Sequence, residues 1–280
     1  MMQSFCRLRL GVRCVGLSGG KSARSRCSFK RMMSVSVFQQ QTYKDFANDN
    51  ITAQLMTEDS HSILDFSQGG TLGKELNLKA KHVVLPSSGE EETTDSVIVD
   101  DFFALSQRGQ EPWIDRVFLE DPAYDIELKN ITDFFYGIYN QMKRQGRLVI
   151  LTRPHDCSHY PLFPLAVDKW NEAHPPVTFY SDRLQRAGFQ VRMKSASTTI
   201  QTETESWMEE IESGRIRAFQ SIEKKEMQNG LEELDDLVEG MEHIQFEDKL
   251  VLITAVKLEE GQETESLIVQ DEGPPYGHCG

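Results

Sequence analysis

The chain has 280 residues, with 30 Lys and Arg against 44 Asp and Glu, which gives a formal net charge of −14. This length fits one large domain or two small ones and is sufficient to bury a full hydrophobic core. The acidic total argues against nucleic acid or an anionic membrane as the main partner, because either would need a basic face. No window approaches the roughly 20 apolar residues of a membrane span.

The acidity lies outside the amino-terminal segment. Residues 1–44 hold nine basic residues and no Asp or Glu, which leaves 21 basic against 44 acidic residues and a net charge of −23 for 45–280. Residues 1–34 are rich in Arg and Ser and have no long apolar run, a composition typical of a mitochondrial presequence and not of a secretory signal. We therefore expect a protein of the mitochondrial matrix. The alternatives are a disordered basic tail on a cytoplasmic protein, or translated sequence upstream of a start at Met32 or Met33.

Cysteine usage is that of a reducing compartment. Only Cys157 and Cys279 lie outside the expected presequence, too few and too far apart in sequence for a disulfide framework. No CxxC pair and no zinc spacing occurs, so the sequence predicts no metal site.

From Phe38 on, short apolar runs alternate with helical patterns, which predicts a mostly parallel sheet with helices on both faces. Gly146 and Gly188 are expected to end two helices, and Ser181 is a candidate N-cap. The expected helices cover 72–78, 131–144 and 178–187. The expected strands cover 61–67, 81–85, 96–100, 115–119, 147–152, 189–193 and 249–258.

A charged, Met-rich stretch at 203–242 is apolar on one face only and predicts two or three helices inserted before the last strand. Its apolar residues would form either a lid over a substrate or a plain core face, and its charge run a solvated surface. The expected fold class is thus α/β, with a doubly wound, mostly parallel seven-stranded sheet over 42–258. Residues 259–280 are expected to be a polar tail.

This order of elements resembles the class I S-adenosylmethionine-dependent methyltransferases from about Thr42 to Lys257. The resemblance is carried by ILDFSQGGTLG at the first strand and turn, DRVFLED at the fourth strand, MKRQGRLVILTRP at the fifth and RLQRAGFQVR before the sixth. It implies a Rossmann-like fold that binds S-adenosylmethionine and transfers its methyl group to a small molecule or protein side chain.

The resemblance places the cofactor's methionine end against the loop after the first strand, where Asp65, Ser67, Gly69 and Gly70 stand. Glycine allows the backbone of such a loop to approach the ligand closely. The family pattern is an acid followed by three alternating glycines. Here Ser67 and Thr71 replace the first and third glycine, which weakens the motif.

Further cofactor contacts are implied at the ends of the next strands. Ser87 stands where the family usually has a ribose-binding acid, and Asp101 with Phe102 would flank the adenine. Glu120 and Asp121 follow the fourth strand and would face the point of methyl transfer, Glu120 beside the cofactor and Asp121 in the substrate pocket. Alternatively, these acids only solvate strand ends and Phe102 begins a core helix.

The loop RPHDCSHY after the fifth strand carries two His, an Asp, a Cys and a Tyr in eight residues. It is expected either to line a substrate pocket through His155, His159 and Tyr160, with one His as general base, or to be a polar loop whose Tyr160 packs inward.

Other enzyme classes lack their motifs here. No GxSxG elbow, P-loop or GxGxxG fingerprint occurs. Methyl transfer depends mainly on proximity and alignment, so an active enzyme needs no obvious catalytic constellation. The alternative function is an inactive member of the fold that acts as an interaction or assembly factor, and a third is a Rossmann-like enzyme that uses another nucleotide.

Overall fold

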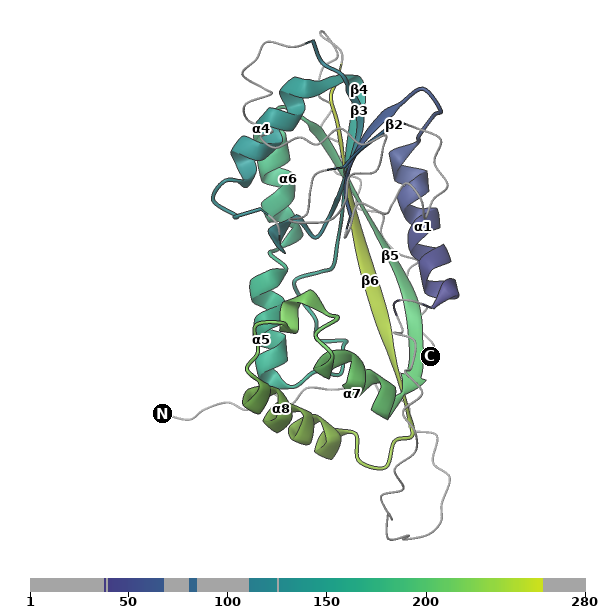
Figure 1. The fold of residues 1–280 in the computed structure, drawn as a ribbon, viewed down its shortest axis with the longest axis vertical. Helices are drawn as coiled ribbons and strands as arrows, with labels where there is room; N and C mark the ends of the chain where they lie inside the picture. Colours follow the sequence, from purple (N-terminus) through teal and green to yellow (C-terminus); the bar gives the residue numbers. More distant parts are fainter. Residues whose placement is uncertain (1–37, 39, 68–80, 85–110, 125, 259–280) are drawn as a thin grey trace, which may run out of the picture.

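The computed structural model describes residues 38, 40–67, 81–84, 111–124 and 126–258. Within these residues lies one mixed sheet of six strands in the order β2-β1-β3-β4-β6-β5 (Figure 1). Neighbouring strands are parallel except for β6, which is antiparallel to both β4 and β5. The strands are β1 (Ser62–Phe66), β2 (Lys81–Val84), β3 (Ile114–Glu120), β4 (Met142–Thr152), β5 (Gln190–Glu203) and β6 (His243–Val256).

Helices cover both faces of this sheet. Helices α4 and α6 pack on one face and α1 on the other (Figure 1). The described part of the chain contains no helix with the length and apolar character needed to cross a membrane. The α-helices are α1 (Gln41–Leu55), α4 (Ile131–Gln141), α5 (Pro164–Ala173), α6 (Val177–Arg186), α7 (Thr204–Glu212) and α8 (Lys224–Leu237), with short 3₁₀ turns η3 (Pro122–Tyr124) and η4 (Arg217–Phe219).

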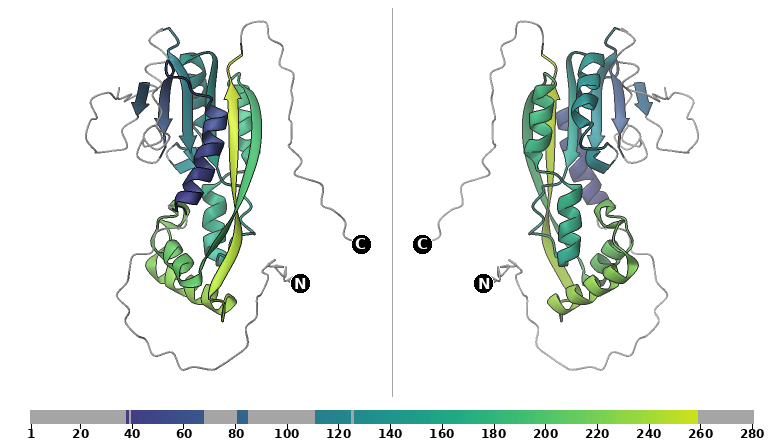
Figure 2. Two further views of the ribbon diagram at one scale, coloured as in Figure 1. Left: turned by 90° about the vertical axis from the view of Figure 1, so that its right-hand side faces the viewer. Right: turned by 90° about the vertical axis from the view of Figure 1, so that its left-hand side faces the viewer.

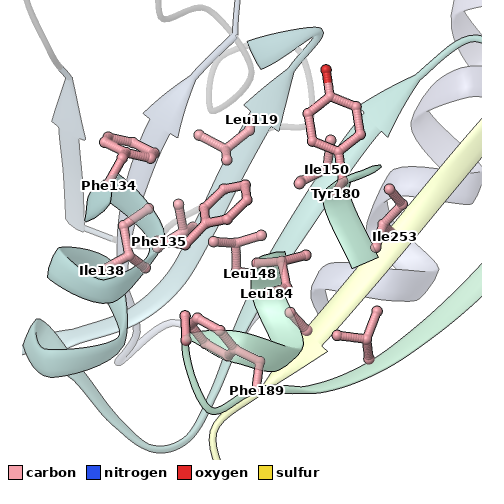
Figure 3. Close-up of a cluster of buried hydrophobic side chains, with 14 of the residues drawn as sticks. Leu119, Phe134, Phe135, Ile138, Leu148, Ile150, Tyr180, Leu184, Phe189 and Ile253 are labelled. Atoms are coloured by element: carbon pink, nitrogen blue, oxygen red, sulfur yellow. The ribbon is translucent and has the colours of Figure 1, made fainter. Parts of the chain in front are cut away.

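The core between the sheet and helices α4 and α6 is formed by apolar side chains from one face of each helix and one face of the sheet. Phe134, Phe135 and Ile138 of α4 meet Leu148 and Ile150 of β4 (Figure 3). On the opposite face, a smaller cluster joins α1 to β3, β4 and β6. Strands β3 and β4 therefore carry continuous apolar runs, as expected for strands buried on both faces.

Strands β5 and β6 form a long hairpin that extends beyond the rest of the sheet (Figure 2). The helices α7 and α8 and the turn η4 connect its two strands at the far end. There they enclose a second core with α5, built on the fully buried Trp207, Phe163 and Phe219. The chain between β5 and β6 is thus helical and packed against the body.

Several local predictions differ from the structure. Helix α4 ends at Gln141, not near Gly146, because Met142 adopts an extended backbone and begins β4. The positive φ of Gln145, 59°, makes the turn inside that strand. Ser181 is not an N-cap: it lies inside α6, where its hydroxyl donates to the carbonyl of Thr178, and Pro176 precedes the helix.

Other predictions agree with the structure or concern residues outside the described ranges. The mixed α/β sheet is confirmed, and Gly188, with a φ of 102°, ends α6 as expected. Helices α1 and α5 were not predicted, and β5 and β6 are longer than expected. The expected strand 96–100 and helix 72–78 lie outside the described residues.

Candidate functional site

A cavity of about 310 Å³ lies at the carboxyl ends of β1, β3 and β4. In an open α/β sheet, ligands bind at this edge because the loops that follow the strands converge there. Helix α1, helix α5 with His174 at its end, Glu210 of α7 and residues 215–217 after α7 complete the wall. The lining residues are Phe38, Tyr43, Lys44, Ala47, Asn48, Ile51, Ser67, Phe118, Glu120, Asp121, Tyr124, Leu151, Thr152, Arg153, Trp170, His174, Glu210, Arg215, Ile216, Arg217 and Leu250.

Asp65 and Ser67 stand where β1 runs into the cavity. Asp65 is 1% exposed, and its Oδ1 accepts a hydrogen bond of 2.8 Å from the backbone N of Ser67. Its Oδ2 is buried and accepts no hydrogen bond within the described ranges. A buried carboxylate oxygen without a donor is costly, and Asp65 itself is not among the residues that line the cavity.

Asp121, directly after β3, has a left-handed backbone with a φ of 41°. Few residues other than glycine adopt this conformation, and Asp is one of them. Its backbone N donates to the carbonyl of Leu151 at 2.8 Å, which ties the turn to β4. The carboxylate lies 4.0 Å from Nη1 of Arg153 and 3.9 Å from Nε2 of His174.

Arg153 belongs to a buried polar cluster beneath the cavity. Its Nε donates to Oδ1 of Asp248 at 3.2 Å, and its Nη2 donates to the Tyr43 hydroxyl at 2.9 Å. The hydroxyls of Tyr43 and Tyr160 both donate to the Asp248 carboxylate. Burial alone would raise the pKa of Asp248, but Arg153 and the two hydroxyls lower it below its ordinary value. Asp248 is therefore a buried carboxylate with a full set of partners.

The chain between α7 and α8 closes the cavity on another side. The Arg217 guanidinium lies 4.4 Å from the centre of the Tyr124 ring, and Arg215 pairs with the buried Glu210 at 3.3 Å. Ile216 lines the cavity, whereas Trp207 and Ile211 are buried in the second core. This segment thus contributes both a cavity wall and a core face.

The structure brings part of the predicted site together. Ser67, Glu120 and Asp121 line the cavity, and Asp65 lies next to Ser67. The positions of Gly69, Gly70, Ser87, Asp101 and Phe102 lie outside the described residues.

Of the loop after β4, Arg153 lines the cavity, but the predicted pocket residues His155, His159 and Tyr160 do not. His155 Nδ1 lies 2.7 Å from the carbonyl of His174, and the Tyr160 hydroxyl donates to Asp248. His159 packs against the Tyr160 ring with centroids 4.5 Å apart. Burial raises the pKa of the Cys157 thiol to about 11, and no cluster of three or more metal-ligating side chains occurs in the described ranges. The structure therefore favours the interpretation in which Tyr160 packs inward.

Sequence reasoning missed the cavity residues His174, Arg153 and Tyr43. Tyr43 lies in α1 and His174 directly follows α5, and neither helix was predicted. The one available signal for His174 was its spacing of four residues from Trp170, which places both on one helix face.

No family model matches the sequence, and no curated protein matches it. Solved structures do match its fold. The YcgJ protein from Bacillus subtilis is 12% identical, with a TM-score of 0.51 over 76% of this chain and 98% of that chain. A protein from Anabaena variabilis, described as a methyltransferase from an antibiotic biosynthesis pathway, is 13% identical, with a TM-score of 0.50 over 74% of this chain and 95% of that chain.

The chain shares the fold of these two structures, one of which is described as a methyltransferase. At such identities the likeness concerns the fold alone, and the activity must be argued from the site.

Proposed function

We propose that this protein binds S-adenosylmethionine and transfers its methyl group to a small molecule or to a protein side chain. The observation that carries the proposal is the cavity at the carboxyl ends of β1, β3 and β4, which combines aromatic walls with a few convergent polar groups. We also propose that a seventh strand at 96–100 extends the sheet, and that 203–242 is the helical insert of this domain.

The described residues fit the cofactor. The free Oδ2 of Asp65 suits the ammonium group of its methionine end, and Ser67 stands beside it. The carboxylates of Glu120 and Asp121 give this end of the cavity a negative charge that suits a sulfonium cation. Gly69, Gly70, Ser87, Asp101 and Phe102 are proposed to complete the cofactor site.

When bound, the cofactor supplies a methyl group activated by its sulfonium. The chain's own contribution is then to hold the acceptor in line, and alignment of two reactants supplies about 7–11 kcal/mol in favourable cases. Tyr43, Tyr124 and Trp170 wall the cavity and would position the acceptor while reducing contact with water.

We expect Asp65→Ala to weaken the binding of S-adenosylhomocysteine by about 1–3 kcal/mol, the cost of losing a hydrogen bond to a charged group. Calorimetry on the full chain measures this change. Asp59→Ala, at an exposed turn before β1, is the matched control and should leave the dissociation constant unchanged. Equal affinities of all three proteins would show that the cofactor does not contact Asp65.

The second candidate is an interaction or assembly factor that keeps the fold without the cofactor. Ser67 favours it, because a side chain stands where the family has its first glycine and the Ser67 backbone N is already bonded to Asp65. In that case the wild-type protein would give no heat with the cofactor.

We propose a mitochondrial matrix location, on the composition of residues 1–34. A reporter fused to residues 1–40 should accumulate in mitochondria, whereas the same fusion with its seven Arg and Lys between positions 7 and 30 replaced by Gln should not. A diffuse cytosolic signal from the unmodified fusion would contradict the proposal.

A further inference from the structure

The cavity contains a deeply buried histidine at the end of α5. The His174 side chain is 3% exposed and lines the cavity. Its ring lies against Trp170 with centroids 4.3 Å apart and meets the Tyr124 ring edge-on at 5.7 Å. Packing on both sides therefore fixes the orientation of the imidazole.

The contacts of His174 define its tautomer. Nδ1 lies 3.1 Å from the carbonyl of Trp170, and because a carbonyl only accepts, Nδ1 must carry the proton. Burial lowers the pKa of His174 below its ordinary value, although the Asp121 carboxylate opposes this shift, so the ring is neutral near pH 7. Nε2 then bears a lone pair.

That lone pair faces another hydrogen-bond acceptor. Nε2 lies 3.9 Å from Oδ1 of Asp121, beyond hydrogen-bond distance. Oδ1 is buried and receives no hydrogen bond in the part of the chain that the structure describes. The left-handed backbone of Asp121 adds a conformation that is costly unless its surroundings hold it, as often found at functional sites. Two acceptors at this spacing call for a donor from a ligand.

We propose that His174 and Asp121 bind the methyl acceptor through an N–H or O–H group, with Nε2 of His174 as the general base. This inference rests on the proposed function. A lone pair of the acceptor atom forms the bond to the methyl carbon, the electrons of the carbon–sulfur bond go to sulfur, and the acceptor's proton goes to Nε2. The acceptor is thus an amine or a hydroxyl compound, because a carboxylate would be repelled by both groups.

The pH dependence follows from the groups around the ring. Asp121 after β3, Arg153 and His155 after β4, and Tyr124 in η3 face His174. The base works only when neutral, so methyl transfer to a hydroxyl compound, which does not itself titrate in this range, should rise with pH through the lowered pKa of His174 and then level off.

Two measurements on the full chain test the inference. In the first, ¹⁵N NMR spectra of the His174 imidazole are recorded in the absence of cofactor. The protein without any probe is compared with the protein plus benzylamine, benzyl alcohol or benzoate, three probes that share a ring suited to the aromatic wall. We expect Nε2 to be unprotonated at pH 7.5. Its ¹⁵N chemical shift should change when the amine or the alcohol is added but not when benzoate is added. A proton on Nε2, an equal response to benzoate, or no response to any probe would overturn the inference.

The second measurement compares His174→Gln with His243→Gln, the same change at an exposed residue. With labelled S-adenosylmethionine and the probe that shifts Nε2, His174→Gln should lower transfer about 100-fold or more and remove its pH dependence, with cofactor affinity unchanged. Transfer at the wild-type rate would overturn the role of His174. Absence of cofactor binding by the wild-type protein would instead overturn the proposed function. The NMR result would still decide whether His174 and Asp121 bind a hydrogen-bond donor.

Discussion

Asp248→Asn should lower the free energy of unfolding by about 3–5 kcal/mol, because it removes the closer and fully buried of the two carboxylates beside the Arg153 guanidinium. Asp248 is 0% exposed and is bonded to Tyr43 of α1 and to Arg153 and Tyr160 of the loop after β4. Urea unfolding followed by circular dichroism measures the loss. Asp236→Asn, at an exposed position of α8, is the control and should change stability by less than about 0.5 kcal/mol.

The same cluster makes a distinct double-mutant prediction. Asp248→Leu with Arg153→Met removes both charges, so it should cost less than the sum of the two single changes. The lowered pKa of Asp248 also sets the sign of the pH effect: its contribution is present above the ordinary carboxyl pKa and is lost as the pH falls. If the stability losses of the two single variants added up to that of the double variant, Arg153 and Asp248 would not stabilise each other.

Trp207→Ala should lower the free energy of unfolding by about 3–5 kcal/mol, the usual cost of removing a fully buried large aromatic side chain. Trp207 lies on α7, is 1% exposed and packs against the Phe246 ring of β6, with centroids 4.6 Å apart and the rings tilted by 50°. Its Nε1 donates to the carbonyl of Pro161 at 2.8 Å, which joins the helices between β5 and β6 to the chain before α5.

A series at this position separates packing from hydrogen bonding. Trp207→Phe keeps most of the apolar contact and should cost less than Trp207→Ala, including about 1 kcal/mol for the lost hydrogen bond. Glu212→Ala, at an exposed position near the end of α7, is the control for the helix itself. If the Ala variant lost less than about 1 kcal/mol, α7 would not be packed against the body as described.

The strands of the sheet centre could be predicted from the sequence because they are buried on both faces. β3 and the second half of β4 carry unbroken apolar runs, and such runs mark central strands of an α/β sheet. The outer half of β5 could not be predicted in this way. Its residues 194–203 alternate in burial and are mostly polar, because the hairpin buries only one face there.

The two helices that the sequence did not predict explain why Tyr43 and His174 were missed. Helix α1 buries only Tyr43, Ile51 and Leu55, too sparse a pattern to show a helical period. Helix α5 begins at Pro164, which is a known start signal, yet its last turn leads to His174, whose role depends on tertiary contacts with Asp121. Asp121 itself was predicted, because its place after an apolar strand puts it at the ligand edge of any sheet of this kind.

Cofactor binding by the wild-type protein is the most direct test of the proposed function. The full chain is titrated by calorimetry with S-adenosylmethionine and S-adenosylhomocysteine, and with NAD and ATP as nucleotides of other Rossmann-like folds. We predict saturable binding of both sulfur compounds at one site, with dissociation constants of about 1 mM or tighter, and none of NAD or ATP. No heat with either sulfur compound, or equal binding of NAD or ATP, would contradict a methyltransferase function.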